Sequence, residues 1–485
     1  MIPRCMSTQH PDNVQVPFFA ERSDLGGEDE IREAYYAYAD LGCDEQMWDV
    51  EGKEVDTFVV KKLLSRYETF FREKQLGRDL RLTLRVPNPE VERAEAKILL
   101  ETLESIPRSY DAARLFYGAD VTPPICEVIL PMTTSAEAID RVYRYYTDFI
   151  IRRQQAAARP GDITIAEWIG EFRPERISVI PLFEDHEHLL AAADITREYL
   201  RDKDVGHQRV FLARSDPAMN YGLVSAVLLI KIALSRLHAM SRDTGVAIYP
   251  ILGMGSAPFR GNLTPHTVDG ICDSYPSVHT FTIQSAFKYD HSPAAVSEAI
   301  AKLMTRETGA PREVDAERAL EIVERYSAEY RRQVIALAKV INEAARFVPS
   351  RRTRKLHIGL FGYARDVGGV RLPRVISFTA ALYSVGLPPE LLGLSALTAD
   401  DLAFVRDAFG SFDRTLQTAL RFADLDGPFM PAEVRDAIRR IGWEVEQSEQ
   451  HLSATRRIVS ALGTGDTTHV PEQVLRAAHA RKFLG

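Results

Sequence analysis

The chain has 485 residues, of which 45% are hydrophobic and 26% are charged. This is an ordinary globular composition, which argues against a disordered or fibrous protein. The 60 basic and 68 acidic side chains leave a net charge of −8, which does not suggest a nucleic-acid-binding protein. A chain of this length can bury a large core without disulfide bonds or other staples.

The four cysteines, Cys5, Cys43, Cys126 and Cys272, lie far apart in the sequence. Because no two of them form a CxxC pair, we expect reduced thiols in a cytoplasmic protein rather than a disulfide framework. The most apolar run, 223–230, is much shorter than the roughly 20 residues that span a membrane. The N-terminus lacks the apolar segment of a signal peptide. We therefore expect neither membrane insertion nor secretion.

Short apolar runs alternate with longer amphipathic stretches along most of the chain. A run such as ISVIPLF (177–183) is nearly continuous in apolar residues, which is typical of a parallel strand buried on both faces. The predicted strands are 46–50, 80–86, 125–130, 177–183, 209–214, 247–253, 278–284 and 356–361. The predicted helices between them include 55–75, 89–105, 134–157, 185–203, 222–243 and 312–347.

This alternation of strands and helices indicates an α/β protein with a parallel sheet. About eight such units favour a closed (β/α)₈ barrel of the TIM type over an open sheet. Beyond residue 388 the pattern becomes helical, with helices expected over 398–424, 431–461 and 470–482. We predict a single catalytic domain over residues 1–485. Its barrel is expected at about 40–385, and a helical extension at 386–485 is expected to pack on the barrel.

Two carboxylates follow neighbouring predicted strands. Glu184 comes directly after ISVIPLF, and Asp216 follows the next strand in RVFLARSD. Barrel active sites form where the carboxyl ends of the strands meet, so the two acids are expected to lie close together there. A pair of protein oxygen ligands, completed by water and substrate, is how Mg²⁺ is commonly held. The alternative is that both acids cap helices, with Asp185 as a competing cap.

Arginines follow several other strands. Arg85 ends RLTLR, Arg260 ends the glycine-rich turn GMGSAPFR, and Arg365, Arg371 and Arg374 follow the last predicted strand. Guanidinium groups match phosphate and carboxylate in a bidentate geometry, and a glycine turn lets backbone N–H groups approach an anion. Their repeated position at strand ends indicates a small, highly anionic substrate. Each arginine taken alone could instead form a structural or surface ion pair.

Two further segments carry polar groups of the right kind. QSAFKYD places Gln284 and Lys288 after a strand, where they could bind substrate or simply begin a helix. The N-terminal RCMSTQHPDN contains His10, which precedes a proline and is therefore biased toward an extended backbone. His10 could lie in an ordinary turn, or could act as a general base near neutral pH.

Taken together, these motifs resemble phosphoenolpyruvate carboxylase of the short, archaeal type. The resemblance rests on MIPRCMSTQHPDN, GMGSAPFRGNL, QSAFKYD and LPRVISFTAALYSVGLPPELLG, and it covers residues 1 to about 395. It implies a barrel that uses Mg²⁺ or Mn²⁺, assembles as a homotetramer and binds phosphoenolpyruvate and bicarbonate. The products would be oxaloacetate and phosphate, formed through carboxyphosphate and a metal-bound enolate, as an anaplerotic supply of C4 acids.

The resemblance also implies roles for individual residues. His10 matches the family's essential histidine, and Glu184 and Asp216 match its metal ligands. Arg85 and Arg260 match catalytic arginines. Arg365 and one of Arg371 or Arg374 fall where further substrate arginines lie, and Gln284, Lys288, Gly253, Met254 and Gly255 fall in substrate-binding motifs.

The sequence departs from the longer enzymes of plants and bacteria. Their glycine loop carries a histidine and an arginine where this chain has Leu252 and Met254. Met254 could instead help to line a dry pocket for CO₂. The chain is about half as long and ends in RKFLG rather than in a QNTG-type tail, so inhibition by aspartate or malate does not follow from the resemblance.

Three other functions compete with this interpretation. A metal-dependent C–C lyase or phosphomutase acting on phosphoenolpyruvate or a 2-oxo acid would use the same acids and arginines, but would not need the histidine. A non-catalytic sensor of a phosphorylated metabolite would not need both carboxylates. A purely structural protein would explain none of the charges at strand ends.

Overall fold

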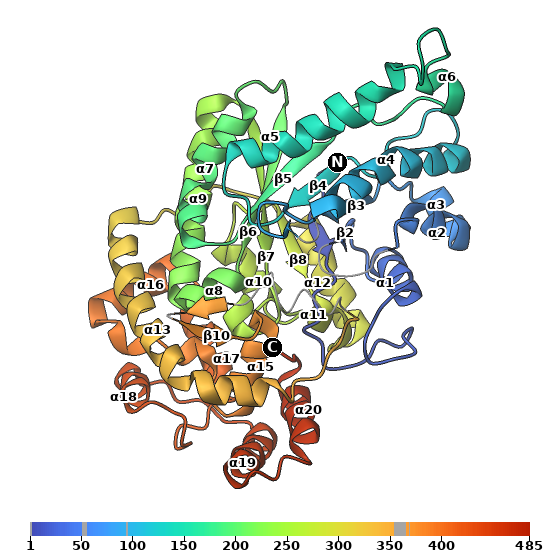
Figure 1. Ribbon diagram of the computed structural model, residues 1–485. Helices are drawn as coiled ribbons and strands as arrows, with labels where there is room; N and C mark the ends of the chain where they lie inside the picture. The colour runs from blue at the N-terminus through green and yellow to red at the C-terminus, as the bar shows by residue number, and fades with distance from the viewer. Residues whose placement is uncertain (1, 51–55, 94–95, 354–364, 368) are drawn as a thin grey trace.

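The computed structural model describes residues 2–50, 56–93, 96–353, 365–367 and 369–485, with only the backbone of 365–367. Its centre is a closed barrel of eight parallel strands surrounded by helices (Figure 1), which confirms the predicted fold class. The strands are β1 (Cys5–Ser7), β2 (Glu45–Asp49), β3 (Arg81–Arg85), β4 (Glu127–Leu130), β5 (Ser178–Phe183), β6 (His207–Ala213), β7 (Ala247–Gly253) and β8 (Thr280–Ile283).

Seven of the predicted strands are present as β2 to β8, but the first strand of the barrel was not predicted. β1 pairs with β8 through Met6 and Thr282, and with β2 through Met6 and Glu45, so it closes the barrel. The barrel therefore begins at Cys5 rather than near residue 40. The predicted strand at 356–361 lies outside the described residues, and the eight strands that close the barrel do not include it.

Only three residues form β1, and hydrogen bonds to the residue just before β2 hold it in place. The carboxylate of Asp44, just before β2, accepts bonds from the backbone N–H groups of Arg4 at 2.8 Å and Cys5 at 2.9 Å. The Met6 side chain points into the barrel, where it packs with apolar residues of neighbouring strands. This short strand leads directly into the TQHP segment, which it delivers to the carboxyl end of the barrel.

The barrel interior has a charged layer and an apolar layer. In the charged layer, the guanidinium of Arg209 bonds to Glu45 at 2.7 Å and to Glu127 at 2.9 Å. Nearer the carboxyl ends of the strands lie Met47, Leu182 and Phe211, which belong to one apolar cluster. The mouth of the barrel therefore has an apolar floor.

Helices surround the barrel and form the extension after it. Those up to residue 305 are α1 (Glu28–Ala39), α2 (Val59–Arg66), α3 (Glu68–Glu73), α4 (Ala96–Tyr117), α5 (Ala136–Arg144), α6 (Ile165–Ile169), α7 (His186–Leu200), α8 (Ser215–Tyr221), α9 (Leu223–Thr244), α10 (Val268–Ser274), α11 (Ser285–Tyr289) and α12 (Pro293–Thr305). The later ones are α13 (Ala316–Ala345), α15 (Val375–Ser384), α16 (Ala399–Phe409), α17 (Phe412–Leu420), α18 (Ala432–Ile441), α19 (Glu449–Thr464) and α20 (Val470–Arg481). The predicted helix at 134–157 continues past α5 as a π-helical turn (Tyr145–Ile151) and a 3₁₀ turn (Arg152–Gln155).

By length and composition, α9 could cross a membrane, and α15 with the turns after it passes the same test only as a sharply bent pair. Most of α9 is buried inside the protein, between α7 and α13. Its apolar character is that of a core helix, because its neighbours cover it on more than one side.

The C-terminal extension returns to the mouth of the barrel. Figure 1 shows the end of the chain beside α11 and α15. The backbone N–H of Leu484 donates to the carbonyl of Asp12 at 2.6 Å, and Arg481 donates to the carbonyls of Phe483 and Leu484. The short strands β9 (Arg365–Val367) and β10 (Val370–Leu372) form a separate antiparallel pair before α15. The single-domain assignment stays a prediction.

Candidate active site

A cavity of about 350 Å³ opens at the carboxyl end of the barrel. It brings together side chains that the sequence places far apart. The predicted residues that line it are His10, Arg85, Glu184, Asp216, Gly253, Arg260, Gln284 and Arg374. The same cavity also includes the apolar floor formed by Met47, Leu182 and Phe211.

The two predicted metal ligands follow neighbouring strands. β5 and β6 pair directly, with Phe183 opposite Leu212, and Glu184 and Asp216 follow these strands into the cavity. The competing helix-cap interpretation is wrong for Glu184, because Asp185 caps α7 by accepting from the N–H of His188 at 3.0 Å. Asp216 lies within the first turn of α8, whose N-terminus has no side-chain cap.

These two half-buried carboxylates fit a hard divalent cation. Mg²⁺ and Mn²⁺ prefer oxygen ligands and keep several positions for water and substrate. Among the described residues there is no group of three or more His, Cys, Asp or Glu side chains that could form a complete protein cage. The donor set of Glu184 and Asp216 therefore suits a cation shared with substrate better than a purely structural metal.

Arg85 is held by an aspartate on the neighbouring strand. Its Nε and Nη2 each donate to a carboxylate oxygen of Asp49 at 2.8 Å. Asp49 is buried, whereas the Arg85 side chain keeps a small exposed area and lines the cavity. The pair fixes the plane of the guanidinium, as a bidentate carboxylate does.

Arg260 is almost fully buried and has partners on several sides. Its Nη2 donates to Oε1 of Gln284 at 2.6 Å, and its Nη1 donates to Asp12 at 3.2 Å and to the Gly485 carbonyl at 2.8 Å. Its Nε donates to Ser215 at 3.2 Å. Burial lowers the pKa of Arg260, an effect that Asp12 opposes, and Asp12 itself has its pKa raised by burial despite Arg260.

The glycine loop positions Arg260. The backbone N–H groups at its tip donate to protein atoms rather than toward the cavity. The N–H groups of Met254, Gly255 and Ser256 donate to Thr282, to the Arg260 carbonyl and to Asp12. A side chain on Gly255 would come within 3.0 Å of the Arg260 guanidinium. The expected approach of these backbone groups to an anion is thus replaced by close packing around one arginine.

Several predicted residues do not line the cavity. Met254 is buried in the core between the barrel and the helices, and Gly255 lies behind Arg260. Lys288 is fully buried and donates to Ser7, Thr8 and Glu33. Arg371 is exposed on β10, whereas Arg374, at the N-terminus of α15, faces the cavity. The side chain of Arg365 lies outside the described residues.

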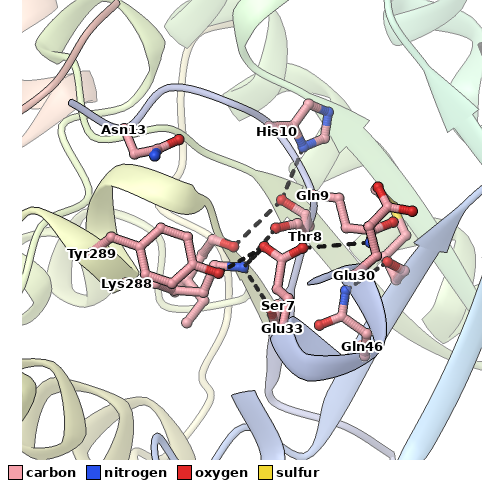
Figure 2. Close-up of polar contacts among 12 residues, drawn as sticks. Ser7, Thr8, Gln9, His10, Asn13, Glu30, Glu33, Gln46, Lys288 and Tyr289 are labelled. Carbon is pink, nitrogen blue, oxygen red and sulfur yellow. Dashed lines mark hydrogen bonds and ion pairs between the residues drawn. The ribbon is translucent and has the colours of Figure 1, made fainter. Parts of the chain in front are cut away.

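His10 follows β1 and lies half-buried at the edge of the cavity. Its Nδ1 is 2.9 Å from Oγ1 of Thr8 (Figure 2). Thr8 in turn is anchored to β8, since its backbone N–H donates to the Ile283 carbonyl at 3.0 Å. The end of the barrel therefore orients the His10 ring, and the choice between a base and an ordinary turn residue stays a prediction.

The sequence did not reveal the buried acids that pair with Arg260, Arg85 and Lys288. Asp12, Asp49 and Glu33 are each buried and paired with Arg260, Arg85 and Lys288, respectively. Asp12 lies within the HPDN motif, so its sequence context could have identified it as a site residue. The other two carry no local signal, because each lies in an ordinary strand or helix.

A parallel barrel with an acid pair, arginines and a histidine at its carboxyl end defines a barrel enzyme for a small, strongly anionic substrate. Comparisons with known proteins give the family. A model of the family described as phosphoenolpyruvate carboxylase matches residues 2–485. The chain is 58% identical to phosphoenolpyruvate carboxylase of Methanothermobacter thermautotrophicus, 56% identical to that of Methanospirillum hungatei and 50% identical to that of Pyrococcus abyssi. These alignments cover 100% of both chains.

The chain belongs to the phosphoenolpyruvate carboxylase family and is accordingly an enzyme of the carboxy-lyase class. Among solved structures, a malate synthase of Haloferax volcanii in complex with magnesium and glyoxylate aligns at 12% identity with a TM-score of 0.37. That alignment covers 66% of this chain and 80% of the other, and its score is too low to add to the assignment.

Proposed function

We propose that the protein converts phosphoenolpyruvate and bicarbonate into oxaloacetate and phosphate. The observation that carries the proposal is the meeting of His10, the Glu184–Asp216 pair and the three predicted arginines Arg85, Arg260 and Arg374 in one cavity. Family membership supplies the substrates, and the cavity has the charge distribution that such substrates require. A C–C lyase or mutase would use the acids and arginines but leaves the oriented histidine without a task.

The arginines hold the phosphate and the carboxylate of phosphoenolpyruvate. Arg85 ends β3, Arg260 lies in the 3₁₀ turn after β7, and Arg374 precedes α15, so three separate segments bring arginines to the cavity. Charge spreads over the phosphoryl oxygens as the phosphorus–oxygen bond breaks, and fixed cations stabilise that charge without reorganising. Because their partners are buried carboxylates and amides, Arg85 and Arg260 keep a set geometry.

Glu184 and Asp216 would hold the divalent cation, Mg²⁺ or Mn²⁺. When bound, it supplies electrostatic stabilisation of the negative charge that develops on the substrate. The two side chains follow adjacent strands of a rigid barrel, so they would fix this charge relative to the arginines.

His10 is the proposed base. A bicarbonate oxygen attacks phosphorus, the bond to the enolate oxygen breaks, and carboxyphosphate forms beside the enolate. His10 then takes the carboxyphosphate proton, after which carboxyphosphate breaks down to CO₂ and phosphate. The enolate carbon attacks CO₂ and gives oxaloacetate. A neutral histidine near pH 7 suits this proton transfer.

CO₂ must be kept from escaping before the enolate attacks it. Met254, which was expected to line a dry pocket, lies in the core instead. The apolar floor of the cavity, formed by Met47, Leu182 and Phe211, can serve this purpose because it offers no strong hydrogen-bonding group to water.

Labelled bicarbonate tests this sequence of steps. If the oxygen of bicarbonate attacks phosphorus, bicarbonate carrying ¹⁸O should deliver one labelled oxygen to each phosphate, as read by mass spectrometry. Phosphate formed without label, alongside oxaloacetate, would contradict carboxyphosphate as the intermediate.

We further propose a cytoplasmic, homotetrameric enzyme that supplies C4 acids. All four cysteines are free, which suits a reducing compartment. The arm formed by α4, α5 and α6 extends from the barrel (Figure 1). It exposes Leu115, Phe149 and Trp168, at 90%, 65% and 71% of their surfaces. Exposed apolar groups of this size favour an interface with another copy, which analytical ultracentrifugation would detect.

A further inference from the structure

A buried acid on α1, Glu33, holds together the segments beneath His10. Both of its carboxylate oxygens lie 2.6 Å from Nη2 of Arg352. The same carboxylate accepts from Nζ of Lys288 at 2.9 Å and from the hydroxyl of Tyr289 at 2.8 Å. Burial acts to raise the pKa of Glu33, but the charges of Arg352 and Lys288 outweigh it and lower the pKa below the ordinary value. Glu33 is therefore a carboxylate at neutral pH.

Lys288 carries the connection from Glu33 to the histidine. Its ammonium also donates to Oγ of Ser7 at 3.0 Å and to the carbonyl of Thr8 at 2.9 Å. Thr8 is the residue that meets the His10 ring, and Figure 2 shows the resulting chain from Glu33 through Lys288 and Thr8 to His10. The three donors of one buried ammonium thus fix the backbone that carries the proposed base.

The side chain of Thr8 also orients the ring of His10. The Thr8 hydroxyl lies 2.9 Å from Nδ1 of His10 and 3.4 Å from the carbonyl of Ile283. It therefore holds the His10 ring beside the end of β8 through Nδ1.

A second connection runs from Glu33 toward Arg85. The side chain of Gln9 approaches Glu33 at 3.5 Å through its amide nitrogen, and its oxygen accepts from the backbone N–H of Asp49 at 3.1 Å. Asp49 is the bidentate partner of Arg85. The carboxylate of Glu33 is thus connected to both the proposed base and one of the cavity arginines.

We propose that Glu33 is a positioning residue for the carboxylation step, keeping His10 in register with the substrate through Lys288 and Thr8. The proposal rests on the proposed function, because it takes His10 as the base that acts on carboxyphosphate. Glu33 acts through other residues, since it does not line the cavity. Without its carboxylate, Lys288 would lose the acid it is paired with, Arg352 would keep Glu30, and the TQHP segment would shift.

The variant Glu33→Gln tests this, with oxaloacetate and phosphate measured together. A displacement of about 1 Å at a catalytic group can reduce a rate about 100-fold, so we expect a loss of that order in oxaloacetate formation. Bicarbonate-dependent phosphate release should fall less, because carboxyphosphate can form without the base. The ratio of oxaloacetate to phosphate should therefore drop below one.

Glu45→Gln is the matched control. Glu45 is as fully buried as Glu33 and is also paired with a buried arginine, Arg209, but in the charged layer inside the barrel. This variant should lose stability while forming oxaloacetate and phosphate one to one. A loss of coupling in both variants would show that the ratio reports general destabilisation, and would overturn the proposal.

The outcomes separate the two proposals. A wild-type protein that makes no oxaloacetate contradicts the proposed function itself. Wild-type coupling of one to one, together with an unchanged rate and ratio in Glu33→Gln, overturns the role of Glu33 alone. If Glu33→Gln does not fold, Lys288→Gln carries the test, because it cuts the connection to Thr8 while leaving Glu33 paired with Arg352. Full coupling in Lys288→Gln would likewise overturn the proposal.

Discussion

Asp49 and Arg85 face one another across two neighbouring strands of the barrel, as register partners of β2 and β3. Two parallel hydrogen bonds of 2.8 Å join their side chains. This pairing lets a strand-end arginine extend into the cavity while its charge is balanced by a buried acid. The geometry at the mouth is therefore fixed by the sheet itself.

Asp49→Asn should disturb Arg85 without removing it. An amide can accept only one of the two hydrogen bonds, so the guanidinium loses its fixed plane and part of its charge balance. We expect kcat/KM for phosphoenolpyruvate to fall by roughly 10-fold or more, since losing one charge-assisted hydrogen bond is worth about 1.5–3 kcal/mol. Steady-state kinetics at saturating bicarbonate measure this, and an unchanged kcat/KM would show that the pair is only structural.

His10→Asn should uncouple the reaction. Asparagine cannot take up the carboxyphosphate proton near neutral pH, so oxaloacetate should be lost while bicarbonate-dependent phosphate release continues, with pyruvate as the other product. Lactate dehydrogenase and malate dehydrogenase, used in parallel assays, distinguish pyruvate from oxaloacetate. Full carboxylation by this variant would mean that another group is the base.

Asp216→Asn should weaken the dependence on the divalent cation. Replacing one of two carboxylate ligands removes a formal charge from the site, so half-maximal activation should need about 10–100-fold more Mg²⁺. Asp185→Asn is the matched control, because Asp185 caps α7 and its loss should affect stability by about 1 kcal/mol at most. Equal activation curves for wild type and Asp216→Asn would remove Asp216 from the metal site.

Arg260→Lys should raise KM for phosphoenolpyruvate. A lysine ammonium cannot reproduce the contacts of the guanidinium with Gln284, Asp12 and Ser215, so the charge is no longer held toward the phosphate. We expect an increase of roughly 10-fold or more. Arg371→Lys, at the exposed position on β10, should leave KM unchanged. Similar KM values for both variants would contradict the placement of the phosphate beside Arg260.

Because Lys231 is buried, we expect the free energy of unfolding to depend on pH. It lies in α9, where burial lowers its pKa to about 7, with Arg312 adding to the effect. The unfolded chain keeps a lysine pKa near 10.4. Between about pH 7 and 10 the unfolded state therefore binds the proton that the folded state has released. The stability of the wild type should rise with pH by about 1.4 kcal/mol per unit across this window.

Lys231→Met removes this group and its pH dependence. At pH 7 the variant should be the more stable protein, and its advantage should shrink as pH rises toward 10. Urea unfolding of both proteins at pH 7, 8 and 9 measures the difference. A difference that stays constant with pH would mean that Lys231 keeps its ordinary pKa in the folded protein.

Much of the fold could be predicted because barrel strands are buried on both faces and form continuous apolar runs. β1 could not, since three residues carry no periodic signal and their pairing depends on Asp44. The segment at 356–361 has a strand-like composition, but the barrel is already closed by β1 against β8. That segment lies outside the described residues, and a strand-like composition does not tell whether a segment joins the barrel.

The site was predictable where it follows a strand end, as for Glu184, Asp216 and Arg260. The partners of these residues were not, because they depend on contacts between distant segments. Arg260 and its partner Asp12, for example, are 248 positions apart. The choice between Arg371 and Arg374 depended on where β10 ends and α15 begins, which the sequence does not fix to within a residue. Lys288 and Met254 were in the right motifs but turn away from the cavity.

The most direct test of the central claim is a coupled assay of the purified protein with phosphoenolpyruvate and Mg²⁺, with and without bicarbonate. Oxaloacetate is followed through malate dehydrogenase and NADH, and phosphate is measured in parallel. We predict that both products form one to one, only with bicarbonate, and that EDTA abolishes both. Folded protein that forms neither product with Mg²⁺ or Mn²⁺ would contradict the account.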